Sequence, residues 1–125
     1  FVENEVCGNR ESGIFVFAGA QPRIADNLCR GNHHFGIAVR DTGSHPELVR
    51  NLCRENMLSG ILLFHYAEAL LVDNTCSGNQ HWGMVMTPDC HPTPGREALD
   101  TSNILAPNPR GTLIVTDQPL GDIGR

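Results

Sequence analysis

The chain has 125 residues, of which 40% are hydrophobic and 18% charged, and this composition is typical of a globular protein rather than a disordered one. Its net charge is −5 and its basic residues form no cluster, so the sequence predicts no nucleic-acid partner. No apolar run approaches the roughly 20 residues that a membrane-spanning helix needs, so no membrane partner is expected.

Along the chain, a repeat with a spacing of 23, 24 and 23 residues begins within the first four positions. Its first anchor is an asparagine at Asn4, Asn27, Asn51 and Asn74. Its second is another asparagine at Asn9, Asn32, Asn56 and Asn79, and its third is a glycine at Gly13, Gly36, Gly60 and Gly83. Because the first residues already lie inside a repeat, we expect the chain to be part of a longer polypeptide.

Each repeat contains three short hydrophobic stretches with the alternation of β-strands. After each glycine, the inward positions begin with Ile14, Ile37, Ile61 and Met84. A second stretch contains Ile24, Leu48 and Leu71, and a third contains Cys29, Cys53 and Cys76, with Cys7 displaced by one residue. Asparagine and glycine are expected at the bends because both tolerate a left-handed backbone. Three strands per repeat predict a triangular coil in which asparagine amides stack as a ladder.

Two segments depart from the repeat. One inserted residue within Arg40–Pro46 predicts a bulge at a corner of the second coil, and the three prolines of Thr87–Gly95 exclude a central strand there. Asn103 and Asn108 restore the asparagine spacing, and residues 111–115 are expected to form a strand. We therefore predict four regular turns over residues 1–87. Residues 88–125 are predicted to form a Pro-rich loop, a degenerate fifth turn and an irregular C-terminal cap or linker of the same domain.

The asparagine and glycine-hydrophobic anchors resemble the right-handed parallel β-helix repeat family of the pectin-lyase-like superfamily. The pattern is similar to β-helix modules of pectin-active enzymes, of bacterial surface and periplasmic proteins, and of F-box proteins. The resemblance implies an all-β, right-handed parallel β-helix. It implies less about function, because the fold hosts lyases, epimerases and binding modules.

Five cysteines raise the question of a metal or disulfide site. Three of them share one column, which cannot surround a zinc ion with four ligands, whereas small buried thiols pack well inside a coil. We expect reduced thiols and no metal or cofactor. Reduced thiols would fit a cytoplasmic location, which nothing else in the sequence indicates.

Catalytic chemistry finds little support among the polar residues. The six histidines are expected at surfaces or corners, with no carboxylate beside any of them. Glu3, Asp26, Arg50 and Asp73 share one column and are expected to form an exposed charge ladder. A carbohydrate-active site needs several acids converging on one groove, so no catalytic residue is assigned.

The remaining candidate is a surface formed by the strands that follow the glycines. Its members are expected to face outward, and they are Phe15, Phe17, Arg40, Leu62, Phe64 and His65. Such an apolar face predicts a cover, either the tail after Pro88, a neighbouring domain or a partner. The favoured function is a non-catalytic repeat module that presents this sheet face to a protein or glycan. The alternatives are a polysaccharide lyase or epimerase domain, and a structural scaffold that forms homo-oligomers through its open coil ends or its apolar face.

Overall fold

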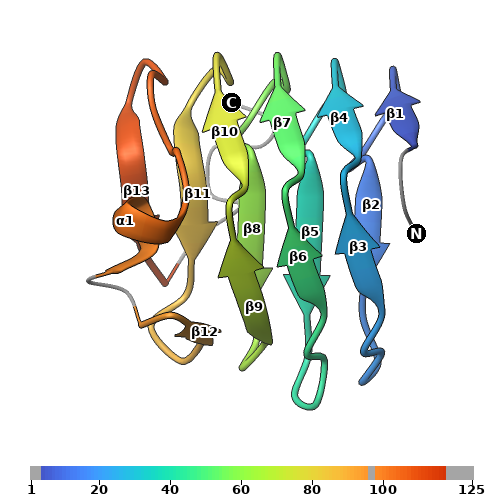
Figure 1. The fold of residues 1–125 in the computed structure, drawn as a ribbon, viewed down its shortest axis with the longest axis vertical. Coiled ribbons are helices and arrows are strands. Elements are labelled where there is room, and N and C mark those ends of the chain that lie inside the picture. The colour runs from blue at the N-terminus through green and yellow to red at the C-terminus, as the bar shows by residue number, and fades with distance from the viewer. Residues whose placement is uncertain (1–3, 96–97, 118–125) are drawn as a thin grey trace.

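The computed structural model describes residues 4–95 and 98–117, and they form a stack of triangular coils (Figure 1). Every strand pairing within the three sheets is parallel, and each strand pairs with its counterpart one coil away. Across these residues no helix is both long and apolar enough to cross a membrane.

Each side of the triangle is one sheet. The first sheet contains β1 (Glu5–Cys7), β4 (Leu28–Arg30), β7 (Leu52–Arg54) and β10 (Thr75–Ser77). The second sheet contains β2 (Ile14–Val16), β5 (Ile37–Arg40), β8 (Ile61–Phe64), β11 (Trp82–Met86) and β13 (Gly111–Val115). The third sheet contains β3 (Arg23–Ala25), β6 (Glu47–Val49), β9 (Glu68–Val72) and β12 (His91–Thr93). The predicted all-β parallel β-helix is confirmed.

The interior consists of the predicted columns. Strand register aligns the hydrophobic residues after the glycines, namely Ile14, Ile37, Ile61 and Met84. These side chains form one buried core with two further columns, namely Ile24, Leu48 and Leu71, and the thiols of Cys29, Cys53 and Cys76. Val6 pairs with Cys29, which turns the neighbouring Cys7 outward, where its thiol is exposed. Burying apolar area in this way contributes about 25 cal/mol per Å² to folding.

Two asparagine ladders run through the corners of the coils. In the second ladder, Asn32 donates from its backbone N and from Nδ2 to Asn56 Oδ1, over 3.1 and 3.0 Å. Asn56 repeats both bonds to Asn79 Oδ1, and Asn79 repeats them to Asn108 Oδ1. Because each buried amide has partners in the adjacent coils, the ladder fixes the register at little desolvation cost.

At the bends, the residue with the left-handed backbone is not the expected one. Positive φ angles occur at the residue before each ladder asparagine from Asn9 to Asn79, for example 59° at Asp26 and 67° at Gly31, and at none of the described asparagines. The asparagine avoids the left-handed conformation because its side chain must reach into the ladder. The repeated glycines are needed for space instead, since a Cβ on Gly36 would lie 2.9 Å from Cys53 Sγ.

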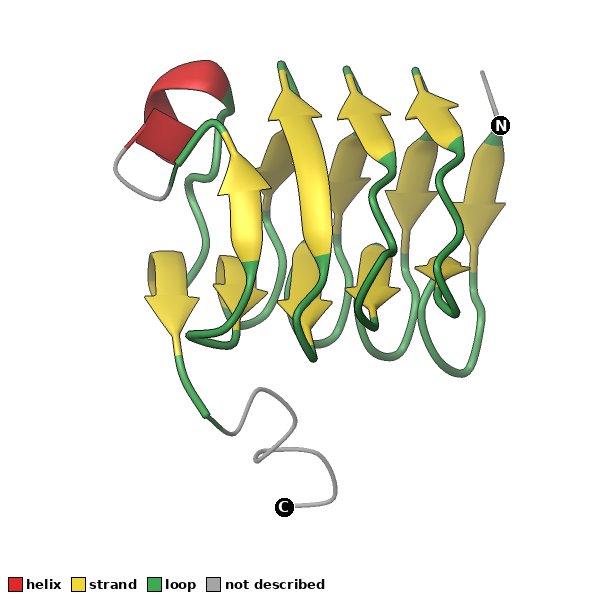
Figure 2. Cartoon of the chain, turned by 90° about the horizontal axis from the view of Figure 1, so that it is seen from below, coloured by secondary structure: helices red, strands yellow, loops and turns green. Residues whose placement is uncertain are grey.

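The last described coil is irregular but continues the stack. β12 contains Pro92 and lies at the edge of the third sheet, where a missing N–H is tolerated. The short helix α1 (Leu99–Ser102) follows, and Asn103 and Asn108 then extend the two ladders. Figure 2 shows α1 at the end of the stack opposite β1.

Candidate functional site

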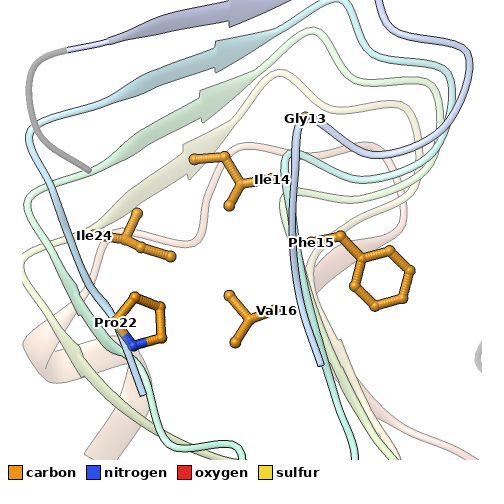
Figure 3. Close-up of a pocket in the computed structure, with 6 residues that line it drawn as sticks. All are labelled: Gly13, Ile14, Phe15, Val16, Pro22 and Ile24. Carbon is orange, nitrogen blue, oxygen red and sulfur yellow. The ribbon is translucent and has the colours of Figure 1, made fainter. Parts of the chain in front are cut away.

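The outer face of the second sheet is defined by the alternation of side chains in its strands. Ile14 and Val16 point into the coil and Phe15 points away from it (Figure 3). Phe15 pairs with Ala38, and Ala38 with Leu62, so the outward residues of successive coils form columns.

Two phenylalanines and one arginine form an exposed group at the start of this face, which we call the aromatic–arginine cluster (Phe15, Phe17 and Arg40). The rings of Phe15 and Phe17 are 44% and 50% exposed and meet edge to face, with centroids 5.5 Å apart. The Arg40 guanidinium lies 5.4 Å from the Phe15 centroid and 5.7 Å from the Phe17 centroid. Each such cation–π contact contributes about 0.5–1 kcal/mol at an exposed site.

Arg40 is held over the rings by Asp41. The Arg40 Nε atom lies 3.3 Å from the Asp41 carboxylate, which also accepts the backbone N–H of Ala18 over 3.1 Å. The carboxylate therefore joins the turn after Phe17 to the turn after Arg40 in the next coil. This double role orients the guanidinium against the two rings.

The exposed apolar patch is smaller than expected, because Leu62 and Phe64 are buried. Both stand on the outward side of β8, yet only 1% of Leu62 and 7% of Phe64 is exposed. They belong to a second hydrophobic cluster with Phe35, Ala38 and Val85, against which Leu58, Trp82 and Ile114 pack. Phe35 and Leu58 from the corners, together with Trp82 of β11 and Ile114 of β13, thus shield the middle of the face. Sequence reasoning missed Phe35 and Trp82, although an aromatic residue directly before a repeat glycine was the available signal.

A small depression lies between the aromatic–arginine cluster and this buried cluster, and we call it the outer-face groove. Its volume is about 110 Å³. It is lined by Glu11, Ser12, Phe15, His34, Phe35, Ala38, Leu62 and Phe64. Its lining is therefore mainly apolar, with three polar side chains. His65 lies beyond Phe64, exposed, with ring centroids 4.7 Å apart.

Histidine and carboxylate placement differs from expectation at one point. His45 Nδ1 lies 3.3 Å from Glu68 Oε2, so the expectation that no histidine has a carboxylate neighbour is wrong. The Glu68 N–H donates to Ser44 O over 3.0 Å, and this bond between adjacent coils brings the two side chains together. Both are exposed, and they lie outside the outer-face groove.

In the charge column that precedes the first asparagine ladder, Arg50 and Asp26 form an ion pair. Arg50 Nε and Nη2 donate to the two carboxylate oxygens of Asp26, over 2.8 and 3.0 Å. The hydrogen bond from Arg50 holds the pKa of Asp26 below its ordinary value. Glu3, the first member of this column, lies outside the described residues.

The five thiols are free, and four of them are shielded from solution reagents by burial. Cys29, Cys53, Cys76 and Cys90 are buried, and Cys7 is exposed. A hydrogen bond with Cys53 and burial raise the pKa of Cys29, while burial raises the pKa of Cys90. Within residues 4–95 and 98–117, no group of three or more histidine, cysteine or acidic side chains is arranged to hold a metal ion.

Comparison with known proteins agrees with this architecture. The family described as right handed beta helix region matches residues 1–103. The chain therefore belongs to the right-handed β-helix family. No curated protein and no solved structure matches it.

Proposed function

We propose that this chain is a non-catalytic β-helix repeat module that binds a protein partner through the outer face of its second sheet. The observation that carries the proposal is the aromatic–arginine cluster beside the outer-face groove. Aromatic and arginine side chains are enriched at the energetic centres of protein interfaces. Two phenylalanine rings left about half exposed gain nothing for the isolated chain, whereas their burial by a partner removes apolar surface from water.

The groove favours a protein over a glycan. Four of its lining residues, Phe35, Ala38, Leu62 and Phe64, are apolar and almost fully buried. A volume of about 110 Å³ fits one apolar side chain of a partner. A sugar ring would place most of its hydroxyl groups against apolar side chains, because only Glu11, Ser12 and His34 of the lining offer hydrogen-bond partners. Each hydroxyl group left unpaired costs about 1–3 kcal/mol.

Catalysis on a sugar is supported less well than binding. The catalytic alternative, a polysaccharide lyase or epimerase, calls for several acidic side chains that converge on one groove. Glu11 is the only carboxylate among the residues that line the groove. The lining thus supplies one acid where the catalytic alternative calls for several.

Selection from a random peptide library displayed on phage tests the proposal. The wild-type chain should retain peptides that carry one aromatic or aliphatic anchor, and Phe17→Ser should weaken their binding at least tenfold, about 1.4 kcal/mol. Ile104→Ser is the matched control, because Ile104 is 61% exposed and bridges to Thr75 of the first sheet. This control should bind the selected peptides like the wild type.

Two results would contradict the proposal. One is that the selected peptides bind Phe17→Ser and the wild type with equal affinity, which would place the interface elsewhere. The other is that no peptide is retained while a glycan array gives signals that Phe17→Ser abolishes. In that case the same face would bind a sugar.

A further inference from the structure

The corner between β8 and β9 holds two neighbouring residues in a left-handed backbone conformation (Figure 1). His65 and Tyr66 have φ angles of 57° and 64°. A side chain crowds the following carbonyl oxygen in this conformation, so residues other than glycine seldom adopt it, and bulky residues least of all. Gly19 and Gly43 occupy the place of Tyr66 in the first two coils, with φ angles of 79° and 86°. The third coil therefore carries a tyrosine where the backbone favours glycine.

The side chain of Tyr66 is not used to hold the fold together. Tyr66 is 60% exposed, which is more than either Phe15 or Phe17. Among residues 4–95 and 98–117, its ring meets no other ring and no guanidinium, and its hydroxyl group forms no hydrogen bond. Only the backbone is held, because the Tyr66 N–H donates to Asp89 Oδ1 over 3.5 Å. A strained residue is thus retained without a packing role for its ring.

The Asp89 carboxylate lies beside Tyr66 in the next coil. It accepts hydrogen bonds from the Tyr66 N–H and the Thr87 hydroxyl group. The bond from Thr87 holds the pKa of Asp89 below its ordinary value, so the carboxylate is ionised at neutral pH. Four other carboxylates each lie no more than 3.3 Å from an arginine or histidine nitrogen, namely those of Glu5, Asp26, Asp41 and Glu68. Asp89 has no cationic partner of this kind in the part of the chain that the structure describes.

The stretch of chain around this corner is acidic. Residues 55–95 contain four acidic residues, namely Glu55, Glu68, Asp73 and Asp89, and neither lysine nor arginine. A cationic group of another molecule would therefore meet a favourable potential here. An aromatic face attracts ammonium and guanidinium groups, and a carboxylate forms charge-assisted hydrogen bonds with them. Tyr66 and Asp89 supply one of each on adjacent coils.

We propose that Tyr66 and Asp89 form a binding site for a positively charged side chain, an arginine or a lysine, of a partner protein. The cationic group stacks on the face of the Tyr66 ring and pairs with the Asp89 carboxylate. A neutral polar group gains neither the cation–π attraction nor the ion pair. Neither residue lines the outer-face groove, and the site does not depend on the function proposed for that groove.

Titration with a capped arginine tests the proposal. N-acetyl-arginine methylamide is added to the isotope-labelled chain and followed by nuclear magnetic resonance, and N-acetyl-citrulline methylamide serves as its neutral isostere. The arginine compound should cause saturable shifts of the Tyr66 and Asp89 amide signals, and the citrulline compound should not. Added salt should weaken the binding, because the interacting charges are exposed to solvent. Equal shifts with the two compounds, or shifts confined to other coils, would overturn the proposal.

Four variants separate the ring, the local charge and the overall charge. Tyr66→Leu should weaken binding roughly three- to fivefold, the loss expected for an exposed cation–π contact, whereas Tyr66→Phe should bind like the wild type. Asp89→Asn keeps an oxygen for the Tyr66 N–H and should weaken binding by a similar factor. Glu55→Gln is the matched control, because it removes one acidic charge of the same segment from another corner. Equal losses for Glu55→Gln and Asp89→Asn would overturn the proposal, as would unchanged binding by Tyr66→Leu.

The stability of Tyr66→Gly provides a measurement that needs no ligand. Glycine adopts a φ of 64° without strain, so the urea midpoint of this variant should rise while the arginine-dependent shift at Asp89 disappears. A lower midpoint would show that the fold itself requires Tyr66. That result would overturn the inference that the tyrosine is retained for binding.

Discussion

A methyl group on Gly60 would occupy space that the next coil already fills. An ideal Cβ built there lies 2.7 Å from Cys76 Cβ, 2.7 Å from the backbone oxygen of Gly83 and 2.9 Å from Cys76 Sγ. Carbon atoms normally approach to about 3.5–4.0 Å, so two coils must separate by roughly 1 Å to accept the methyl group. Two of the three contacts involve atoms that no rotamer change can move.

The cost of Gly60→Ala follows from that separation. Overpacking a core costs about 1–3 kcal/mol, and weakening one or two hydrogen bonds costs about 1 kcal/mol each. One of the bonds affected joins Gly60 N to Gly83 O over 3.1 Å. We therefore expect a loss of about 3–5 kcal/mol, measured by urea unfolding followed by circular dichroism.

Gly78→Ala is the control, because its cost has a different origin. Gly78 has a φ of 68° and no atom within 4 Å of an added Cβ, so only backbone strain of about 1–2 kcal/mol is expected. Replacing Cys76 with alanine should not rescue Gly60→Ala, since Cys76 Cβ and Gly83 O remain in place. The reasoning fails if Gly60→Ala is less destabilising than Gly78→Ala.

Four further outcomes are expected. Glu55 is exposed with a φ of 58°, so Glu55→Gly should raise the free energy of unfolding by about 0.5–1 kcal/mol, whereas a lower melting temperature would contradict the strain argument. Because Arg50 lowers the pKa of Asp26, the stabilisation from this pair is present above the ordinary carboxyl pKa of about 3.9 and is lost as pH falls through the lower folded value. Asp26→Asn should therefore flatten the decline of stability in that acid range, and an unchanged decline would exclude the pair as its cause. A thiol reagent should label Cys7 alone in the native chain, and rapid labelling of a second thiol would contradict the buried column. Phe64→Ser should lower stability by about 3 kcal/mol or more, because the ring is 7% exposed, and an unchanged unfolding midpoint would show that the ring is not packed.

The interior of the fold could be predicted from the sequence because parallel coils stack in register. Equal spacing then places Ile14, Ile37 and Ile61 in one column, and alternation assigns each side chain to the inside or the outside. The asparagine ladders follow from the same periodicity. Both expectations depend only on counting along the chain.

Exposure on the outer face could not be predicted in this way. Alternation shows that Leu62 and Phe64 point outward, but it does not show what covers them. Phe35 stands at a corner, where the backbone turns and the period-two rule for side-chain direction no longer applies, and Trp82 is the first residue of β11. The position of the left-handed residues was missed for a related reason. Asparagine tolerates that conformation better than Arg50 or Glu55 does, and only the ladder keeps the asparagine out of it.

The strand pairing has a mechanical consequence. Since each strand hydrogen-bonds only to strands of adjacent coils, the stack is a one-dimensional array whose stability is the sum of contributions from single coils and their junctions. A defect in the third coil, such as Gly60→Ala, should divide the array into two short blocks, each below the length that folds unaided. The same defect in the first coil should only release the terminal unit. The position of a substitution along the stack therefore decides how the chain unfolds. It either unfolds cooperatively as a whole or unfolds locally from one end.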